Sequence, residues 1–322
     1  MFSARKEILV LLFILLGSDH SSGWGFYGHR KINYMACFTL PPELFGFYKQ
    51  HIDFITEHAV DPDKRRYSDQ EEPPRHYIDL DHYGASPFDS VPVSWKNAIE
   101  KFTEDTLKAY GIVPWYIHSM MFRLTEAFRT RQVDRILYYS ANIGHYIGDA
   151  HVPLHCTENY NGQMTNQVGI HGFWESRLPE IFGDRYDYLL GRAHYVDHVQ
   201  EDIWRFVRDS FLALDTVLNF ERNLNEAFPS DRKYAIENRG AVTLKVFSME
   251  YSESFHAMLD GQVERRLREA ILDVGSLWYT AWVDAGSPDL SVFPQKEISD
   301  SLKNEISNEM NTKKTIAGVR EE

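Results

Sequence analysis

The sequence predicts an all-α protein with a single, mostly helical domain. Several long segments repeat apolar residues three and four positions apart, which is the period of a helix, and few segments alternate apolar and polar residues as half-buried strands do. Over 322 residues, 43% are hydrophobic and 25% are charged. This ordinary globular composition excludes a disordered chain, a collagen-like chain and a disulfide-stapled miniprotein.

Residues 1–23 predict a secretory signal peptide. Arg5 and Lys6 precede an unbroken apolar run at 8–16, and small residues follow the run up to Gly23. The apolar run is shorter than the roughly 20 residues that a membrane-spanning helix needs, so a permanent membrane anchor is the weaker interpretation. We therefore expect an exported protein, secreted or periplasmic, whose mature chain begins at Trp24.

The mature chain divides into a helical domain and a polar end. Turn-forming or polar residues bound its clearest helical segments, which are 115–128, 133–148, 203–218 and 263–282. After residue 291 the aromatic residues cease except for Phe293, and Lys, Glu, Ser and Asn accumulate. We expect one catalytic domain at 24–291 and a polar C-terminal tail at 292–322 that is mobile or weakly helical.

The charge and the cysteines set further limits. The formal net charge of −13 argues against a protein that binds polyanions through a broad basic surface, but a small anionic group held by metal ions stays compatible with it. Cys37 and Cys156 would meet an oxidising compartment after export. A disulfide between them is an open alternative, because the sequence does not show that they are close.

Histidines and carboxylates are concentrated between residues 145 and 175. His145 and Asp149 are four residues apart on a helical pattern, His155 follows the next turn, and His171 and Glu175 repeat the four-residue spacing. Imidazole nitrogen and carboxylate oxygen are favoured zinc ligands. One such pair is more often a structural hydrogen bond, but five candidates in this short stretch, with intervening glycines that let helices approach closely, favour a metal site.

The quoted motifs resemble a known superfamily. HYIGDAHVPLH at 145–155, GIHGFWESRL at 169–178 and WGFYGH at 24–29 resemble the zinc-dependent phospholipase C and single-strand nuclease superfamily. The resemblance implies a mostly helical single domain with a trinuclear zinc site, in which an N-terminal Trp binds metal through its amino group and carbonyl. On these motifs it assigns the ligand positions to Trp24, His29, His145, Asp149, His155, His171 and Glu175.

Two ligands that the resemblance implies lie outside the dense run. In PRHYIDLDHY the better match is His76, and in HAVDPDKRR we choose Asp63, with Asp61 as the competing aspartate. Asp79 and Asp81 either orient a ligating histidine or are ordinary loop carboxylates. Other histidines are expected to be surface or hydrogen-bonded core residues, namely His51, His58, His82, His118, His194, His198 and His256. For His151 we expect packing or the orientation of a ligand, and for Phe173, Trp174, Tyr186 and Tyr188 we expect a place in the core.

Zinc chemistry makes phosphodiester hydrolysis the natural reaction. Zinc brings the pKa of water toward neutrality and neutralises phosphoryl oxygens and the departing alkoxide. Asp149 is expected to bridge two sites, and Asp63 is expected to act as a ligand or general base near the attacking water. Both are therefore the candidate catalytic residues.

The substrate class divides the superfamily. The short connection from His155 to His171 lacks an Asp-x-Gly-Gly-Asn element, and together with Glu175 this favours a phospholipase C over a nuclease. Choline specificity is less well supported, because Tyr27 stands where those enzymes carry a Glu. The expected partners are a phospholipid or another phosphodiester with transient membrane-surface contact, and no obligate protein partner is evident.

Two alternatives remain from the sequence. A single-strand-specific nuclease or nucleotidase would use the same metal site and bind single-stranded nucleic acid. A non-catalytic secreted module would hold zinc for structure only. The second alternative is disfavoured, because nine candidate ligands for three ions leave open positions for water, whereas a structural zinc is closed by four protein ligands.

Overall fold

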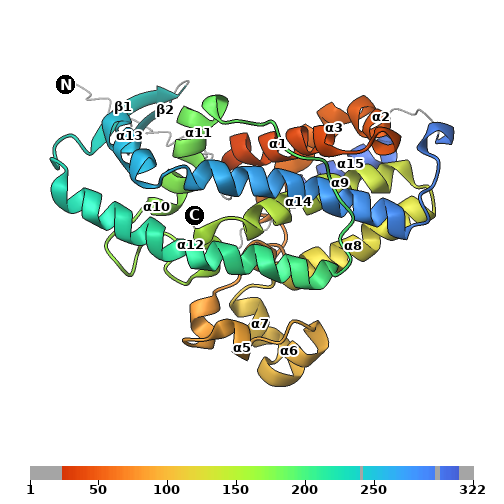
Figure 1. Cartoon of the computed structure of the whole chain (residues 1–322), viewed down its shortest axis with the longest axis horizontal. Coiled ribbons are helices and arrows are strands. Elements are labelled where there is room, and N and C mark those ends of the chain that lie inside the picture. Colours follow the sequence, from red (N-terminus) through yellow and green to blue (C-terminus); the bar gives the residue numbers. More distant parts are fainter. Residues whose placement is uncertain (1–23, 240–241, 294–297, 312–322) are drawn as a thin grey trace, which may run out of the picture.

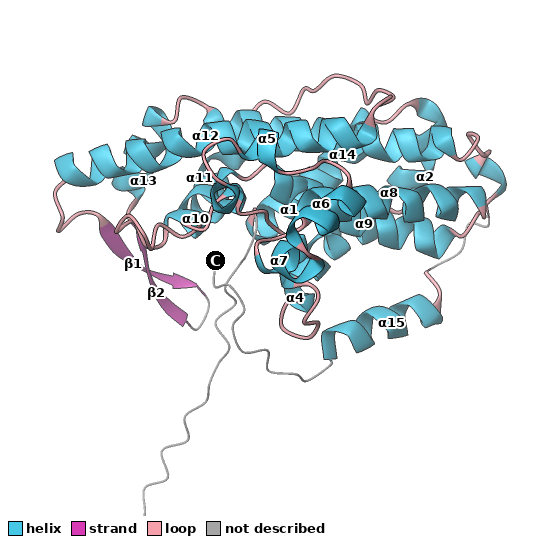
Figure 2. Cartoon of the chain, turned by 90° about the horizontal axis from the view of Figure 1, so that it is seen from below, coloured by secondary structure: helices cyan, strands magenta, loops and turns pink. Residues whose placement is uncertain are grey.

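The computed structural model describes residues 24–239, 242–293 and 298–311, and confirms the helical fold class. Figure 2 shows helices throughout the molecule and a small antiparallel hairpin at one end. The hairpin joins β1 (Tyr234–Arg239) and β2 (Val242–Phe247), with Tyr234 opposite Phe247. The predicted signal peptide at 1–23 lies outside the described residues.

The four long helices that the apolar period predicted are all present. They are α8 (Val113–Arg129), α9 (Val133–Ala150), α12 (Val199–Ala227) and α14 (Gln262–Asp284). Each extends beyond its predicted segment by one or more residues, since helix ends are the least sharply marked part of an apolar pattern. In Figure 1, α12 and α14 run lengthwise through the molecule, and α8 packs against α9, α12 and α14.

The N-terminal helices pack on this framework. They are α1 (Gly25–Ala36), α2 (Pro42–Gln50), α3 (Ile52–Glu57) and α4 (Asp61–Arg65). Helix α1 contacts α3, α9 and α14. Two glycines of α9 allow this approach, since a Cβ atom at Gly144 would lie 2.0 Å from Asn33 Oδ1, and one at Gly148 would lie 3.2 Å from His29 Nδ1. The close packing places His29 directly beside α9.

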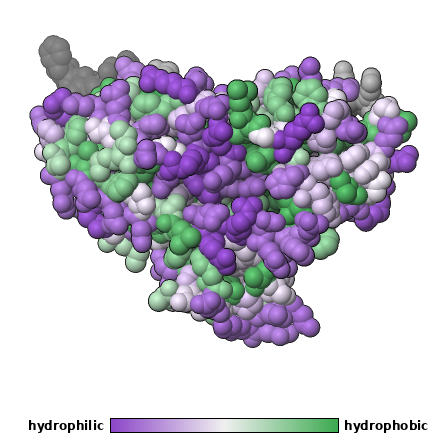
Figure 3. Space-filling view, in the orientation of Figure 1, coloured by the Kyte–Doolittle hydropathy of each residue, from purple (hydrophilic) through white to green (hydrophobic). Residues whose placement is uncertain are grey.

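Shorter helices complete the described structure. A lobe of α5 (Pro87–Ser90), α6 (Trp95–Phe102) and α7 (Glu104–Ala109) projects from the body in Figure 1. The others are α10 (Ile170–Gly172), α11 (Leu178–Phe182), α13 (Met249–Met258) and α15 (Asp300–Asn311). On the face shown in Figure 3, hydrophobic residues form small groups scattered among hydrophilic ones. No helix in the described part of the chain is long and apolar enough to cross a membrane.

The structure addresses two points that the sequence left open. Cys37 and Cys156 are both buried free thiols, so the disulfide that the sequence left open is not formed. In the expected tail, α15 forms a helix of 12 residues that buries Leu302 and Ile306 and contacts α4. This part of the tail is packed on the domain rather than a mobile appendage, because its two apolar side chains are one helical turn apart and face the body.

Candidate metal centre

The predicted side-chain ligands come together in three buried groups. In each group the donor atoms lie within 4.8 Å of one another. The groups are His29 with His145 and Asp149, Asp63 with His76 and His145, and His155 with His171 and Glu175. Every predicted ligand that binds through a side chain therefore belongs to a group, although these residues come from six separate segments of the chain.

Asp149 on α9 lies between the groups. Its Oδ1 is 3.4 Å from His29 Nε2 and 3.8 Å from His155 Nδ1, and its Oδ2 is 3.2 Å from His145 Nε2 and 2.9 Å from His76 Nδ1. The helical spacing brings His145 and Asp149 to one face of α9, and α1 brings His29 against that face. The two oxygens of one carboxylate thus face different groups, which is the arrangement that a bridging ligand requires.

The structure distinguishes the two competing aspartates. Asp63 Oδ1 lies 3.5 Å from His145 Nε2 and 3.8 Å from His76 Nδ1. Asp61, although also buried, binds His58 Nδ1 at 2.5 Å and Lys64 Nζ at 3.1 Å. Both residues belong to α4, but their side chains point in different directions. By position Asp63 belongs to a candidate donor group, and Asp61 is fixed outside the groups.

The third group depends on a local departure from α-helical geometry. His155 lies in a 3₁₀-helix, Pro153–Cys156, that follows α9. His171 is in α10, and Glu175 is in the short π-helix Phe173–Arg177 that continues it. Glu175 Oε2 lies 2.9 Å from His171 Nε2 and 3.4 Å from His155 Nε2. The wider turn of a π-helix is a frequent feature of functional sites.

Backbone carbonyls orient two of the histidines. His145 Nδ1 is 2.8 Å from the carbonyl of Ala59, and His155 Nδ1 is 2.6 Å from the carbonyl of His76. A carbonyl only accepts, so each Nδ1 carries the proton and donates it. The lone pair of each Nε2 then faces the carboxylates of its group, as a ligating histidine requires.

A carboxylate that the sequence analysis did not single out faces His76. Glu72 Oε1 is 3.5 Å from His76 Nε2, which leaves Nδ1 of the same ring toward Asp63 and Asp149. Asp81, one of the two residues considered for such a role, instead accepts hydrogen bonds from the Thr157 hydroxyl at 2.6 Å and the Glu158 amide at 3.0 Å. Asp81 is therefore a loop carboxylate that fastens the segment after His155.

The electrostatics of the groups favour ionised carboxylates. Burial alone would raise the pKa of Asp149, but His145, His155 and His29 around it lower that pKa well below the usual range. Burial also lowers the pKa of His29, with a further lowering by His145. At His76 burial opposes the charged form, but the hydrogen bond with Asp149 and the facing carboxylate of Glu72 prevail and raise its pKa to about 9.

The donor set fits zinc. It consists of imidazole nitrogens and carboxylate oxygens, which zinc prefers, and its members are at most 2% exposed. Within the described structure, His155 Nε2 and Asp149 Oδ1 are buried without a hydrogen bond. Buried polar atoms in native proteins nearly always have a partner, so these atoms are explained by a bound cation.

Trp24 lies at the start of α1, where the chain enters the site. Its indole Nε1 donates to the carbonyl of Gly148 at 2.7 Å, and its ring packs 5.0 Å from that of Trp174. Gly25 follows with a φ of 56°, and a Cβ there would lie 2.7 Å from Ser176 Oγ. The Gly28 amide donates to the Trp24 carbonyl at 3.0 Å, so the Trp24 backbone is held at the first turn of the helix that carries His29.

Arg66 is a buried cation beside the groups that sequence reasoning missed. It is 1% exposed, and its Nη1 lies 4.0 Å from Asp63 Oδ1. A guanidinium presents a fixed fork of donors that suits phosphoryl oxygens. Arg66 belongs to the motif DPDKRR at 61–66, so its nearness in sequence to Asp63 was the signal that could have indicated it.

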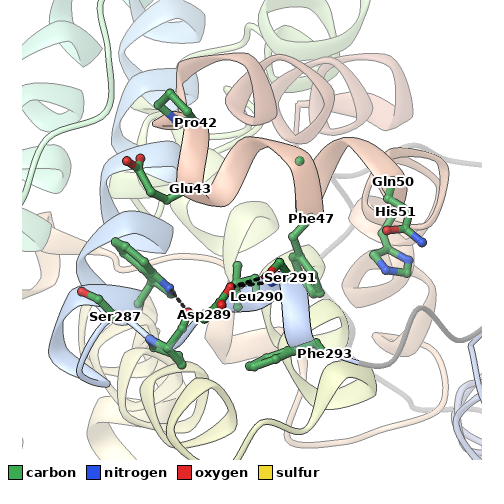
Figure 4. A pocket seen from close by; sticks show the side chains of 13 residues that line it. Pro42, Glu43, Phe47, Gln50, His51, Ser287, Asp289, Leu290, Ser291 and Phe293 are labelled. Atoms are coloured by element: carbon green, nitrogen blue, oxygen red, sulfur yellow. Dashed lines mark hydrogen bonds between the residues drawn. The ribbon is translucent and has the colours of Figure 1, made fainter.

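Other expected packing residues stay outside the groups. His151 Nδ1 donates to the carbonyl of Ile147 at 2.8 Å, and its Nε2 lies 3.0 Å from Asp273 Oδ2. Phe173 and Trp174 are buried in the core. A cavity of about 670 Å³ between α2 and residues 287–293 is lined by Glu43, Phe47 and Asp289 among others (Figure 4). None of the candidate ligands lines this cavity, so it is separate from the metal centre.

A helical domain that gathers three buried groups of histidine and carboxylate donors has the architecture of a zinc-dependent phosphodiesterase. The family model of the S1/P1 nucleases matches residues 24–270. The chain therefore belongs to the S1/P1 nuclease family, a zinc-dependent family within the superfamily that its motifs resemble. A search of curated proteins gives no match.

The family match favours the alternative substrate class over the preferred one. Glu175 and the short segment between His155 and His171 favoured a phospholipase C on sequence alone. The matched family is that of nucleases, which fits the alternative better and gives phospholipid and membrane contact no support. A glutamate at position 175 offers zinc the same carboxylate oxygen as an aspartate would, so this ligand does not discriminate between substrates.

Proposed function

We propose that this protein is an exported nuclease that hydrolyses phosphodiester bonds of single-stranded nucleic acid with three zinc ions. The observation that carries the proposal is the position of Asp149 between the donor groups of a chain in the S1/P1 nuclease family. Zinc in these groups would activate water and neutralise the charge of a phosphoryl group. A non-catalytic zinc module is not favoured. A structural zinc is closed by four protein ligands, whereas ligands shared between three ions would leave positions open for water.

The candidate ligands can be assigned to three zinc ions. His29 and Asp149 would hold one ion with the Trp24 amino group and carbonyl, Asp63 and His76 a second, and His155, His171 and Glu175 a third. His145 belongs to both of the first two donor groups. Asp149 would be shared between ions. We assign Asp63 to a ligand or general-base role, because its carboxylate lies at the edge of the groups beside Arg66.

Arg66 supports a phosphodiester substrate. Its buried guanidinium stands 4.0 Å from Asp63 and supplies a positive charge that does not depend on pH. The burial of the donor groups favours a flexible single strand of nucleic acid as the substrate, since every side-chain donor is at most 2% exposed. A single strand can bend a phosphate toward a recessed centre more easily than the stiff double helix can.

The test compares substrates on one protein preparation. The mature chain beginning at Trp24 is loaded with zinc and offered single-stranded DNA, single-stranded RNA, duplex DNA and phosphatidylcholine vesicles. We expect cleavage of both single strands to exceed cleavage of the duplex, with no release of the lipid headgroup. Hydrolysis of phosphatidylcholine without cleavage of nucleic acid would return the protein to the phospholipase branch, and inactivity on every substrate would favour the non-catalytic module.

A further inference from the structure

Helix α15 reaches the neighbourhood of the metal centre from outside the family match. The match ends at residue 270, whereas α15 spans Asp300–Asn311. In Figure 2 the helix lies along the same side of the molecule as α4. Leu302 and Ile306 are buried, and Arg135 holds Glu305 through contacts of 2.7 and 2.8 Å. This helix is thus an addition to the matched domain that is firmly packed on it.

Glu309 at the end of α15 contacts the buried residue Arg65. Glu309 Oε2 lies 3.4 Å from Arg65 Nη1, and its Oε1 accepts from the Tyr138 hydroxyl at 2.9 Å. Its backbone carbonyl accepts from the Ser68 hydroxyl at 2.6 Å. Arg65 is only 6% exposed, so the contact is largely shielded from water. A carboxylate brought by the C-terminal helix therefore partly neutralises a cation of the matched domain.

Arg65 links Glu309 to Glu72. Its Nε is 3.3 Å from Glu72 Oε2, and Arg75 Nη1 is 2.6 Å from the same oxygen. The other oxygen of Glu72 accepts from the Tyr146 hydroxyl and faces His76 Nε2 at 3.5 Å. An unbroken series of contacts thus runs from the C-terminal helix to a candidate zinc ligand.

The charges along this series show what Glu309 does. Without Glu309, the cations Arg65 and Arg75 share the buried carboxylate of Glu72, and Arg75 has a further contact with the partly exposed Asp69 at 3.4 Å. Two arginines that draw on one carboxylate leave it a weaker acceptor for His76 and leave excess positive charge near a site for cations. A carboxylate that faces a ligating histidine makes that histidine a better ligand. Because Glu309 shares the charge of Arg65, it leaves Glu72 more available to His76 and so favours metal binding.

We propose that Glu72 is a positioning residue for His76, and that Glu309 of α15 strengthens zinc binding by balancing Arg65. The inference rests on the proposed metal centre. Neither carboxylate touches a candidate ion or substrate, so both act through other residues. The C-terminal helix then sets how tightly this chain retains zinc, beyond what the matched domain supplies.

The test measures zinc affinity by competition with a chromophoric chelator on metal-free mature protein. Glu72→Gln should lower the affinity for the zinc ion beside His76 about tenfold to hundredfold, the usual effect of removing a carboxylate that orients a ligating histidine. Glu309→Gln, one contact further away, should weaken it by a smaller factor, on the order of threefold. Glu305→Gln is the matched control, because it removes an ion pair of the same helix with Arg135 and lies outside the series of contacts from Glu309 to His76.

A second measurement separates positioning from helix docking. Thermal unfolding of the metal-free proteins should shift similarly for Glu305→Gln and Glu309→Gln, since each loses one ion pair of α15. Only Glu309→Gln should lose zinc affinity, and excess zinc should restore its turnover to the wild-type value.

The outcomes are distinct. Wild-type zinc affinity in Glu309→Gln, or an equal loss in Glu305→Gln, overturns the role of α15. Wild-type affinity in a folded Glu72→Gln protein overturns the role of Glu72. Wild-type protein that binds no zinc overturns the proposed metal centre itself, and with it this inference.

Discussion

Replacement of Asp149 by Asn perturbs the carboxylate that the structure places between the donor groups. The side chain keeps its size but loses its charge and one of its two acceptor oxygens. In the structure these oxygens face four histidines at 2.9–3.8 Å. We therefore expect more than one zinc ion to bind more weakly, whereas Glu175→Gln should weaken mainly the ion held by His155 and His171.

The size of the effect follows from the role of a shared ligand. Loss of an ion that stabilises the transition state costs several kcal/mol, and each ~1.4 kcal/mol is tenfold in rate. We expect Asp149→Asn to lose at least about a hundredfold in phosphodiester hydrolysis, which corresponds to roughly 2.7 kcal/mol. Asp61→Asn is the matched control, because Asp61 is buried in the same region but binds His58 and Lys64 instead.

The assay combines three measurements on the same preparation. Zinc content is measured by elemental analysis, turnover with single-stranded DNA, and folding by the helical circular dichroism signal in excess zinc. The expected result is a folded protein with fewer ions and low turnover, beside an Asp61→Asn control with wild-type values. A well-folded Asp149→Asn protein with its full zinc content and near wild-type turnover would refute the bridging role.

Further predictions concern the ligands and the proton of His76. Extra residues before Trp24 should lower zinc content and turnover, because an amide nitrogen does not ligate as an amine does, and equal values in both forms would remove Trp24 from the site. Asp63→Asn should lose zinc, in contrast to Asp61→Asn, and the reverse result would exchange their roles. Chelation should lower the melting temperature, since zinc stabilises the folded state that binds it, and an unchanged value would contradict this. In metal-free protein the raised pKa of His76 contributes stability that is fully present below pH ~6.5 and is lost as the pH rises through about 9. This contribution amounts to at most roughly 3 kcal/mol. Melting curves from pH 6 to 10 should show the loss only without zinc, because zinc replaces the proton on His76.

The sequence was sufficient for features that depend on local spacing. The apolar period located α8, α9, α12 and α14, because a helix repeats its buried face at fixed intervals whatever it packs against. The pair at 145 and 149 was placed on one face of α9 for the same reason. The resemblance supplied His76 and Asp63, which spacing alone could not connect to α9.

Features that depend on long-range packing escaped prediction. Glu72 stands four residues before His76, the same spacing as the pair at 145 and 149, but Pro73 and Pro74 between them interrupt a helical pattern. Its contacts with Tyr146 and Arg65 arise only from long-range packing. The polar composition after residue 291 concealed α15, because two buried apolar residues and a few ion pairs suffice to hold a helix on a surface that already exists. The hairpin after α12 was missed because its alternation is short.

The measurement that tests the metal centre most directly is the anomalous scattering of crystals of the mature protein at the zinc absorption edge. We predict three zinc peaks, one at each donor group, with ligand distances of about 2.0–2.3 Å and with Asp149 in contact with more than one ion. A single peak, or peaks that lie away from Asp149 and the histidines around it, would contradict the proposed trinuclear centre.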